Sequence, residues 1–505
     1  MSGLRTALAP LVGGASKSAA ISADELAKPA RTPNKWLILI AMTGSLSMVM
    51  LDQTVVSVAL PSMTRDLPLT ASGQQWVISA YVLAIAALVA FGGKLGDMLG
   101  RVSTFRWGVF LFFVASAACG LVPEGSSGQG CLIAARAMQG VGAALMMPVS
   151  ASIVMAAFPL RERGRAMAMY AGISQIFLAL GPLLGGYLTE YVSWRAVFWL
   201  NVPVGMAALV LVRIAQPPNV AEDSSPFRVR DLVLVAAGIG TSVFAVQQAG
   251  NWGWTAVSTL SLLALGIALT AAFVVMQLRE ANPLLKIRLF QHRAFVANVV
   301  VMGLLQFGLL GVVLYSSLYG QNLLGFSPTR AGVNAFALIV PLTVAAQLGG
   351  RWYDKVGVRG PVLTGLAFCV VGIMLWTLSL RQLAYPPMIP GMILTGIGLG
   401  LTISPTNTDG LGSVAAEDRG QASGLIQTVR QLGATLGIAV IGSVVLAAAH
   451  SGPRLAGHAA QQHAADAIQL GFGVASIAFL LALVAGWLLM PRVRPARQRG
   501  GGPTT

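Results

Sequence analysis

Long apolar stretches, separated by short polar ones, run through almost the whole chain. A bilayer core about 30 Å thick needs roughly 20 apolar residues in a helix that rises about 1.5 Å per residue. Fourteen stretches come close to this requirement, and we expect each to be a membrane-spanning helix. They are Trp36–Val58, Trp76–Gly93, Thr104–Val122, Leu132–Phe158, Ala166–Thr189, Trp194–Val212, Leu232–Ala249, Val257–Leu278, Ala294–Leu318, Ala331–Trp352, Val362–Leu380, Pro387–Gly410, Ala422–Ala449 and Ile468–Met490.

The composition agrees with this pattern. Of the 505 residues, 55% are hydrophobic and only 10% are charged. A soluble protein of this size needs far more polar residues to cover its surface. The sequence therefore predicts an all-α polytopic membrane protein. We expect no cleaved signal peptide, because the first apolar stretch is not followed by a small-residue cleavage site.

The distribution of charge predicts the orientation in the membrane. A net charge of +16 would suggest a nucleic-acid partner in a soluble protein, but here the basic residues gather at the ends of the spans, so we expect none. With both termini in the cytoplasm, all but six of the 33 lysines and arginines fall on that side. Such an excess is typical of cytoplasmic loops. We therefore expect a multi-pass protein of the cytoplasmic membrane with both termini inside and the lipid bilayer as a partner.

An internal repeat divides the chain into two halves. Four landmarks recur 257 positions later, namely Gly93 as Gly350, Asp97 as Asp354, Gly100 as Gly357 and Pro148 as Pro405, and Arg163-Gly164 recurs 256 positions later as Arg419-Gly420. A repeat of this kind is common among transporters. It predicts five regions: a cytoplasmic tail over 1–35, a six-helix bundle over 36–215, two extra spans over 216–280, a second six-helix bundle over 281–490 and a basic cytoplasmic tail over 491–505.

Two charged residues lie inside predicted spans of the first half. Asp52 follows Leu51 in the first span, and Arg136 lies in the fourth. Charges within a membrane are costly and often functional. The antiparallel directions of these spans place both residues at a similar depth, in the outer halves, so they could influence each other. Alternatively, Asp52 makes a structural hydrogen bond between helices, and Arg136 extends to the outer interface. The repeat gives neither residue a counterpart.

Helical spacing adds candidate cavity residues. Ser45 and Met48 share the face of Asp52, while Gln139 and Met147 share the face of Arg136. Methionine adapts to varied apolar ligands, although packing explains most methionines equally well. Arg430, in the thirteenth span, lies near the inner edge and extends to water if its helix is straight. Otherwise it lines the inner cavity.

Two further motifs contain glycine. The loop after the second span reads Gly93-Lys94-Leu95-Gly96-Asp97-Met98-Leu99-Gly100-Arg101. Its glycines permit a tight turn, and Asp97 can cap a helix or pair with Arg101 or Arg163. The fifth span contains Gly181-Pro182-Leu183-Leu184-Gly185-Gly186. Here proline bends the helix and the glycines allow close packing.

With these motifs the chain resembles the major facilitator superfamily, in particular its fourteen-span drug:proton antiporters. The resemblance extends from Trp36 to Met490 and includes the Trp194-Arg195 motif that ends in Asn201, Pro203 and Gly205. It implies two six-helix bundles with two extra central helices. It also implies a proton site at Asp52 and Arg136, a cytoplasmic gate at Gly93, Asp97, Gly100, Arg101 and Asp354, and an antiporter motif at Gly181, Pro182, Gly185 and Gly186. The antiporter motif is partial, because Phe177 and Ala179 replace upstream glycines.

The resemblance implies proton-coupled efflux of small hydrophobic or cationic toxic compounds by alternating access. We expect protons and a small molecule as partners, a functional monomer and no cofactor besides the proton motive force. The sequence contains no phosphate-binding loop of the type GxxxxGK[ST], and we expect neither a metal site nor an enzymatic activity. Alternatives are a dedicated exporter of a metabolite, lipid or siderophore, a proton-coupled importer, and a membrane-embedded enzyme or receptor.

Overall fold

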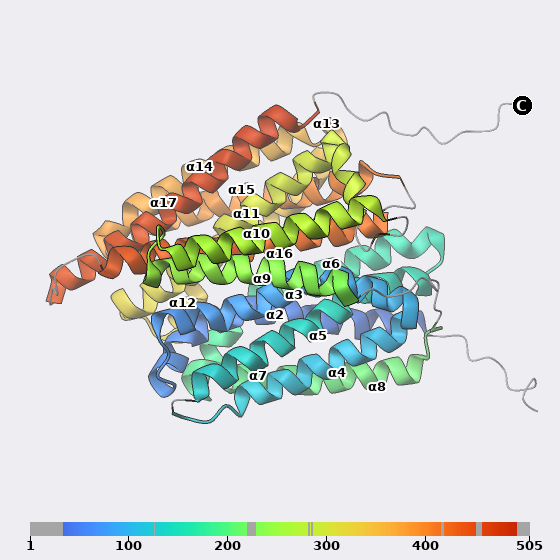
Figure 1. Cartoon of the computed structure of the whole chain (residues 1–505), viewed down its shortest axis with the longest axis horizontal. Helices are drawn as coiled ribbons and strands as arrows, with labels where there is room; N and C mark the ends of the chain where they lie inside the picture. Colours follow the sequence, from blue (N-terminus) through green and yellow to red (C-terminus); the bar gives the residue numbers. More distant parts are fainter. Residues whose placement is uncertain are drawn as a thin grey trace, which may run out of the picture.

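The computed structural model describes residues 34–125, 127–219, 229–280, 283, 286–415, 419–450 and 457–491. Over these residues the chain forms long helices that run side by side (Figure 1) and no strand. Thirteen helices are long and apolar enough to span a membrane, and the bent helix α6 adds a fourteenth. The predicted all-α, polytopic fold is therefore confirmed. The predicted tails at 1–35 and 491–505 lie almost entirely outside the described residues.

The helices form two bundles joined by a hairpin. The first bundle contains α2 (Lys35–Asp66), α3 (Ala71–Leu99), α4 (Arg101–Gly120), α5 (Gly128–Ala157), α6 (Leu160–Tyr191), α7 (Ala196–Trp199) and α8 (Asn201–Ala215). The hairpin is α9 (Val229–Trp252) and α10 (Val257–Arg279). The second bundle contains α11 (Arg293–Leu318), α12 (Pro328–Asn334), α13 (Phe336–Val356), α14 (Arg359–Ser379), α15 (Ile389–Gly412), α16 (Arg419–His450) and α17 (Gly457–Leu489), with short turns η1 (Ile287–Gln291), η2 (Tyr319–Leu323), η3 (Leu380–Gln382) and η4 (Pro386–Met388).

Several helices extend beyond the predicted spans. Helix α2 continues through Pro61 to Asp66, and α17 begins at Gly457 instead of Ile468. The predicted tenth span is divided into α12 and α13 at Ala335. Apolar length reports only the part of a helix that lies in lipid, whereas backbone hydrogen bonds continue through polar turns outside it. The boundaries were therefore wrong where a polar segment remains helical.

The internal repeat is visible in how the helices cross. A Cβ atom on Gly142 of α5 would lie 2.5 Å from the backbone nitrogen of Phe112 in α4. A Cβ atom on Gly398 of α15 would lie 2.5 Å from the backbone nitrogen of Cys369 in α14. Because these pairs are related by the repeat offset, each bundle contains the same glycine-dependent crossing of its third and fourth spans.

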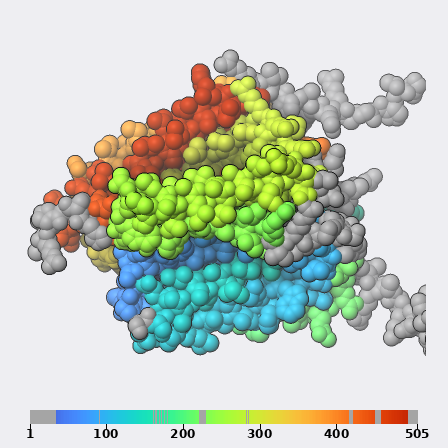
Figure 2. Space-filling view, in the orientation of Figure 1, coloured from blue at the N-terminus to red at the C-terminus, as the bar shows by residue number. Residues whose placement is uncertain are grey.

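The extra hairpin lies over one seam between the bundles. Helix α9 packs against both α3 and α16, and a Cβ atom on Gly250 would lie 3.0 Å from the Cα atom of Ser443. Helix α10 packs mainly on α9 and crosses the front of the molecule between the two bundles (Figure 2). It exposes Val257, Leu260 and Ile267, which are 82%, 52% and 58% accessible. This apolar outer surface is suited to lipid contact.

The two bundles are joined at one end. We call the end where α2 begins and α17 finishes the terminal face, and the other end the opposite face; the terminal face lies on the right in Figure 1. Three hydrogen bonds link the bundles near the opposite face: Gln321 Nε2 to the Val58 carbonyl at 2.9 Å, the Thr329 amide to Glu190 Oε2 at 2.9 Å, and Gln75 Nε2 to Tyr315 Oη at 3.2 Å. The bundles therefore meet in a closed arrangement at that face.

Candidate buried ion-pair site

Asp52 and Arg136 form an ion pair in the interior of the first bundle. Arg136 Nη1 donates to Asp52 Oδ2 at 2.5 Å, and the residues are 1% and 0% exposed, respectively. The expected proximity of the two residues is confirmed. The alternative in which Arg136 extends to the outer interface is wrong, because its guanidinium turns inward to α2 and satisfies its charge there.

Gln139 connects this pair to a wider polar network. Its Nε2 donates to Asp52 Oδ1 at 2.9 Å and lies 3.2 Å from Ser116 Oγ, while its Oε1 accepts from Arg136 Nη1 at 2.7 Å. Asn201 Nδ2 donates to the same Ser116 hydroxyl at 3.0 Å. The network therefore joins α2, α4, α5 and α8. Asn201 belongs to the motif identified in the sequence, but nothing in the pattern indicated Ser116.

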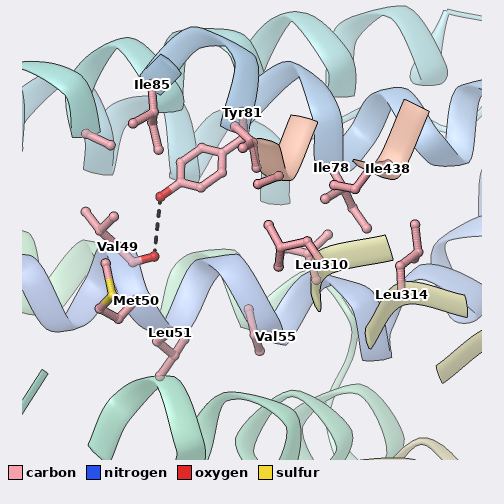
Figure 3. Packing of buried hydrophobic residues seen from close by; sticks show 14 of the residues in the cluster. Val49, Met50, Leu51, Val55, Ile78, Tyr81, Ile85, Leu310, Leu314 and Ile438 are labelled. Atoms are coloured by element: carbon pink, nitrogen blue, oxygen red, sulfur yellow. Dashed lines mark hydrogen bonds between the residues drawn. The ribbon is translucent and has the colours of Figure 1, made fainter. Parts of the chain in front are cut away.

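The arginine is also held by helix α3. Arg136 Nε donates to the Val77 carbonyl at 3.0 Å, and its guanidinium carbon lies 4.3 Å from the ring centroid of Tyr81. Tyr81 reaches across to α2, where its hydroxyl donates to the Val49 carbonyl at 3.4 Å (Figure 3). A hydrogen-bonded, ring-stacked guanidinium is fixed in position more firmly than a lysine would be.

The contacts of Asp52 fit both interpretations of its role. Each carboxylate oxygen accepts a hydrogen bond from α5, so the residue fastens two helices together, as a structural role requires. The same side chain is a titratable group with no exposed surface, so exchange of a proton with water requires the surrounding helices to move. A buried pair of this type is costly to break on one side only, at about 3–5 kcal/mol.

The predicted cavity residues are buried within the first bundle. Ser45, Met48 and Met147 are at most 9% exposed, and Ser45 Oγ donates to the Ala41 carbonyl of its own helix. Gln139 binds the ion pair, because the two predicted faces of α2 and α5 pack against each other. Their role as lining of a substrate cavity stays a prediction.

Arg430 has a different environment from Arg136. Its Nε is buried and has no hydrogen-bond partner among the described residues. The amide nitrogens of Gln427 and Gln431, on the same side of α16, are likewise buried without partners in this part of the chain. This environment fits a side chain held between helices better than one that extends to water.

The predicted gate loop is a tight turn between α3 and α4. Gly100 has φ +92°, a conformation that favours glycine, and Asp97 Oδ1 lies 3.3 Å from Arg101 Nη2. Gly93 faces Pro148 of α5. Asn219, which the sequence patterns did not indicate, caps α4, because its Oδ1 accepts from the Val102 amide at 3.0 Å.

The glycine in the second copy of this turn also has a positive φ. Gly357 has φ +85°, matching Gly100, while Asp354 is exposed to solvent. The repeat therefore preserves the turn conformation. The described residues show the carboxylate–arginine pair in the first copy, between Asp97 and Arg101.

The span-five motif lies between the bundles. Cβ atoms on Gly181 and Gly185 would collide with Thr54 and Val55 of α2, whereas one on Gly186 would collide with the backbone of Pro328 in the second bundle. In return, Gly332 of α12 packs on the backbone of Pro182. The motif therefore places α6 in close contact with α2 on one side and with α12 on the other.

The fold and these motifs agree with comparisons to known proteins. Residues 42–438 match the family model of the Major Facilitator Superfamily, and the chain belongs to that family. It is therefore a multi-pass membrane transporter of small molecules and not an enzyme. The family accounts for the two repeated bundles, while the extra hairpin α9–α10 is an addition between them.

Similar sequences carry names that refer to resistance and efflux. The chain is 32% identical to the multidrug resistance protein Stp of Mycobacterium tuberculosis, over 81% of this chain and 76% of that protein. It is 31% identical to the puromycin resistance protein pur8 of Streptomyces alboniger, over 96% and 97% of the two chains. It is 32% identical to the multidrug efflux pump LfrA of Mycolicibacterium smegmatis, over 94% of each.

Solved structures support the fold alone. An auto-inhibited peptide transporter of the POT family superposes with a TM-score of 0.65 at 14% identity, covering 93% of this chain and 99% of that one. A D-xylose–proton symporter superposes with a TM-score of 0.62 at 16% identity, covering 90% and 97%.

Proposed function

We propose that this protein exports small toxic molecules across the cytoplasmic membrane in exchange for protons. The observation that carries the proposal is the buried Asp52–Arg136 pair, which belongs to the first bundle and has no repeat-related copy in the second. Export as the direction of transport is supported by the names of the relatives and by the glycine–proline motif of α6. The inward proton gradient supplies the energy, at about 2.3 kcal/mol per proton for each 100 mV.

The proton step uses the two oxygens of Asp52. Protonation removes the negative charge that Arg136 faces, while the Val77 and Gln139 carbonyl oxygens continue to accept from its guanidinium. Arg136 therefore keeps its place on α5 and α3, whereas the hold of α5 on α2 weakens. The energy of α2 in its present position then depends on whether Asp52 carries a proton.

Helix α2 connects this change to the contact between the bundles. Val58, six residues beyond Asp52, accepts a hydrogen bond from Gln321 of the second bundle. A shift of α2 thus acts on the closure of the opposite face. We assign the terminal face to the cytoplasm, from the distribution of basic residues, so the opposite face is the external one. The unit of transport is a single chain, since both halves of the pathway lie in it.

Proton release from inverted membrane vesicles tests the proposal. Vesicles energised by respiration are given ethidium, and proton efflux is followed with a pH-sensitive dye. Wild type is expected to release protons, and Asp52→Asn to release none, because asparagine has almost the same shape but cannot carry the proton. Its amide oxygen can accept only one of the two hydrogen bonds that the carboxylate accepts. Asp231→Asn serves as the matched control, since Asp231 is a second buried acid, 6% exposed, on α9. Equal efflux from wild type and Asp52→Asn would exclude Asp52 from coupling.

A further inference from the structure

Helix α16 lies on the boundary between the two bundles. It packs on α11 of its own bundle, where Cβ atoms on Gly433 and Gly437 would collide with backbone carbonyl oxygens of that helix. It also packs on α3 of the first bundle, where a Cβ atom on Gly442 would lie 2.5 Å from the side-chain amide of Gln75. Contacts this close fix the rotation of α16 about its axis, and with it the direction of each side chain.

Arg430 lies well inside this helix. Helix α16 begins at Arg419 on the terminal face, and Arg430 is three turns further along, roughly 16 Å from that end. It is the only charged residue between Gln421 and Ala449, a stretch that is apolar enough to span a membrane. A charged side chain at such a position is costly to insert and marks a functional site by default.

The Arg430 side chain has no acceptor in the described part of the protein. It forms neither an ion pair nor a hydrogen bond there, and its Nε is buried. The adjacent helix α15 carries an acid, Asp409, but that carboxylate accepts from Asn298 Nδ2 at 2.7 Å and from Tyr353 Oη at 3.3 Å. Arg430 as a whole is partly accessible, so its terminal guanidinium nitrogens are open to water or to a ligand.

Gln427 supplies a second donor beside Arg430. The two residues are three positions apart, so their side chains are neighbours on the surface of α16. The Nε2 of Gln427 is buried and has no acceptor among the described residues, while the residue as a whole is partly accessible. Rotation of the amide turns this donor towards a ligand. A guanidinium and an amide side by side match the two oxygens of an acidic group.

We propose that Arg430 binds the carboxylate of organic acids that have a mainly apolar body, with Gln427 as a second donor. The inference rests on the proposed export of small molecules and names one substrate class for it. A carboxylate replaces the water around the guanidinium with hydrogen bonds and an opposite charge, while the apolar body packs on the uncharged remainder of the helices. An ammonium group gains nothing here, because it faces a like charge. Molecules without an acid, such as ethidium, bind without this contact.

Three pyrene derivatives with the same ring and tail test the proposal. Pyrenebutyric acid carries a carboxylate, pyrenebutanol a hydroxyl group and pyrenebutylamine an ammonium group. Their binding to the purified full-length protein is measured by equilibrium dialysis, with protein-free detergent micelles as the blank. We expect saturable binding of pyrenebutyric acid, about tenfold tighter than that of pyrenebutanol. Pyrenebutylamine is expected to bind no better than the alcohol.

Variants assign the preference to one residue. Arg430→Gln is expected to weaken binding of pyrenebutyric acid about tenfold and to leave binding of pyrenebutanol as in wild type. Arg430→Lys, which keeps the charge but not the paired donors, is expected to fall between the two. Arg213→Gln, at an exposed position near the end of α8, is the control and is expected to bind all three ligands as wild type does.

Folding and proton coupling are controlled separately. The melting temperature of Arg430→Gln is expected to be at least that of wild type, because Arg430 makes no hydrogen bond with the described residues. Dialysis involves no proton gradient, so a failure of coupling at Asp52 would leave this result intact. The proposal would be overturned if wild type showed no saturable binding of the acid, if Arg430→Gln bound the acid as tightly as wild type, or if it lost acid and alcohol binding equally.

Discussion

Thr54 of α2 supplies the hydrogen bond that Pro182 removes from α6. Proline has no amide hydrogen, so Pro182 leaves the carbonyl of Leu178, one turn earlier, without its helical partner. The Thr54 hydroxyl lies 3.2 Å from that carbonyl oxygen and equally far from the Leu51 carbonyl oxygen of its own helix, so its proton is shared between the two. Helix α6 bends by 40° between Leu178 and Leu180. The motif of the first span and that of the fifth therefore form one structural unit.

Replacing Thr54 with valine tests this unit. Thr54→Val keeps the side-chain shape but leaves the Leu178 carbonyl buried without a donor, which is expected to cost about 1–3 kcal/mol. We expect a lower apparent melting temperature in detergent and slower transport. Thr54→Ser, which keeps the hydroxyl, is expected to retain most of both.

A second threonine on the same helix provides the matched control. Thr43 is also buried, but its hydroxyl has no hydrogen-bond partner among the described residues. Thr43→Val is therefore expected to leave the melting temperature unchanged or raise it. If Thr54→Val and Thr43→Val behave alike, the Thr54 hydroxyl does not support the bend.

Gly186→Ala is expected to prevent closure of the opposite face. The added Cβ atom would collide with the Pro328 carbonyl and the Thr329 backbone of the second bundle, and neither can turn away as a side chain could. We expect loss of transport and increased maleimide labelling of a cysteine placed at Val58, in a background without the three native cysteines. The melting temperature should change less, because the three atoms nearest to the added Cβ all belong to the second bundle.

The same helix contains a suitable control for that experiment. Gly172 of α6 has open space around the position of a Cβ atom. Gly172→Ala should therefore transport and label as wild type. Normal labelling at Val58 in Gly186→Ala would show that the bundles close without this glycine contact.

The stability and the coupling role of the ion pair can be measured separately. Arg136→Gln leaves Asp52 buried without its cation and is expected to cost about 3–5 kcal/mol. The double variant Asp52→Asn with Arg136→Gln removes both charges and is expected to recover much of that stability. Transport should be absent from both variants, measured as ethidium efflux from cells. Recovery of efflux together with stability would assign the pair a purely structural role.

Replacing Arg430 is expected to raise stability, in contrast to replacing Arg136. The Nε of Arg430 is buried without a partner among the described residues, so Arg430→Met removes a buried donor that makes no hydrogen bond. Arg430→Met is expected to raise the free energy of unfolding by about 1 kcal/mol, which would be measured as a higher apparent melting temperature. A fall in the melting temperature comparable with that of Arg136→Gln would show that Arg430 makes stabilising contacts.

The sequence alone was sufficient for the class of fold and for the principal charged residues. Apolar length specifies spans because lipid provides no hydrogen bonds to an open backbone, and a charge inside a span is conspicuous for the same reason. Gly100 and Gly357 were recognisable as turn residues because they occupy the same position in the repeated motif. Both have a positive φ. Asp52 and Arg136 could be expected at one depth from the directions of their helices.

The tertiary structure decided which faces meet. Helical spacing placed Ser45, Met48, Gln139 and Met147 on two helix faces, and the structure shows that those faces pack together around the ion pair. Rotation of a helix about its axis is determined by its neighbours, and a single sequence of mostly apolar spans contains little information about it. The same reason explains why the roles of Ser116 and Thr54 were not predicted, since each depends on contacts between residues far apart in the chain.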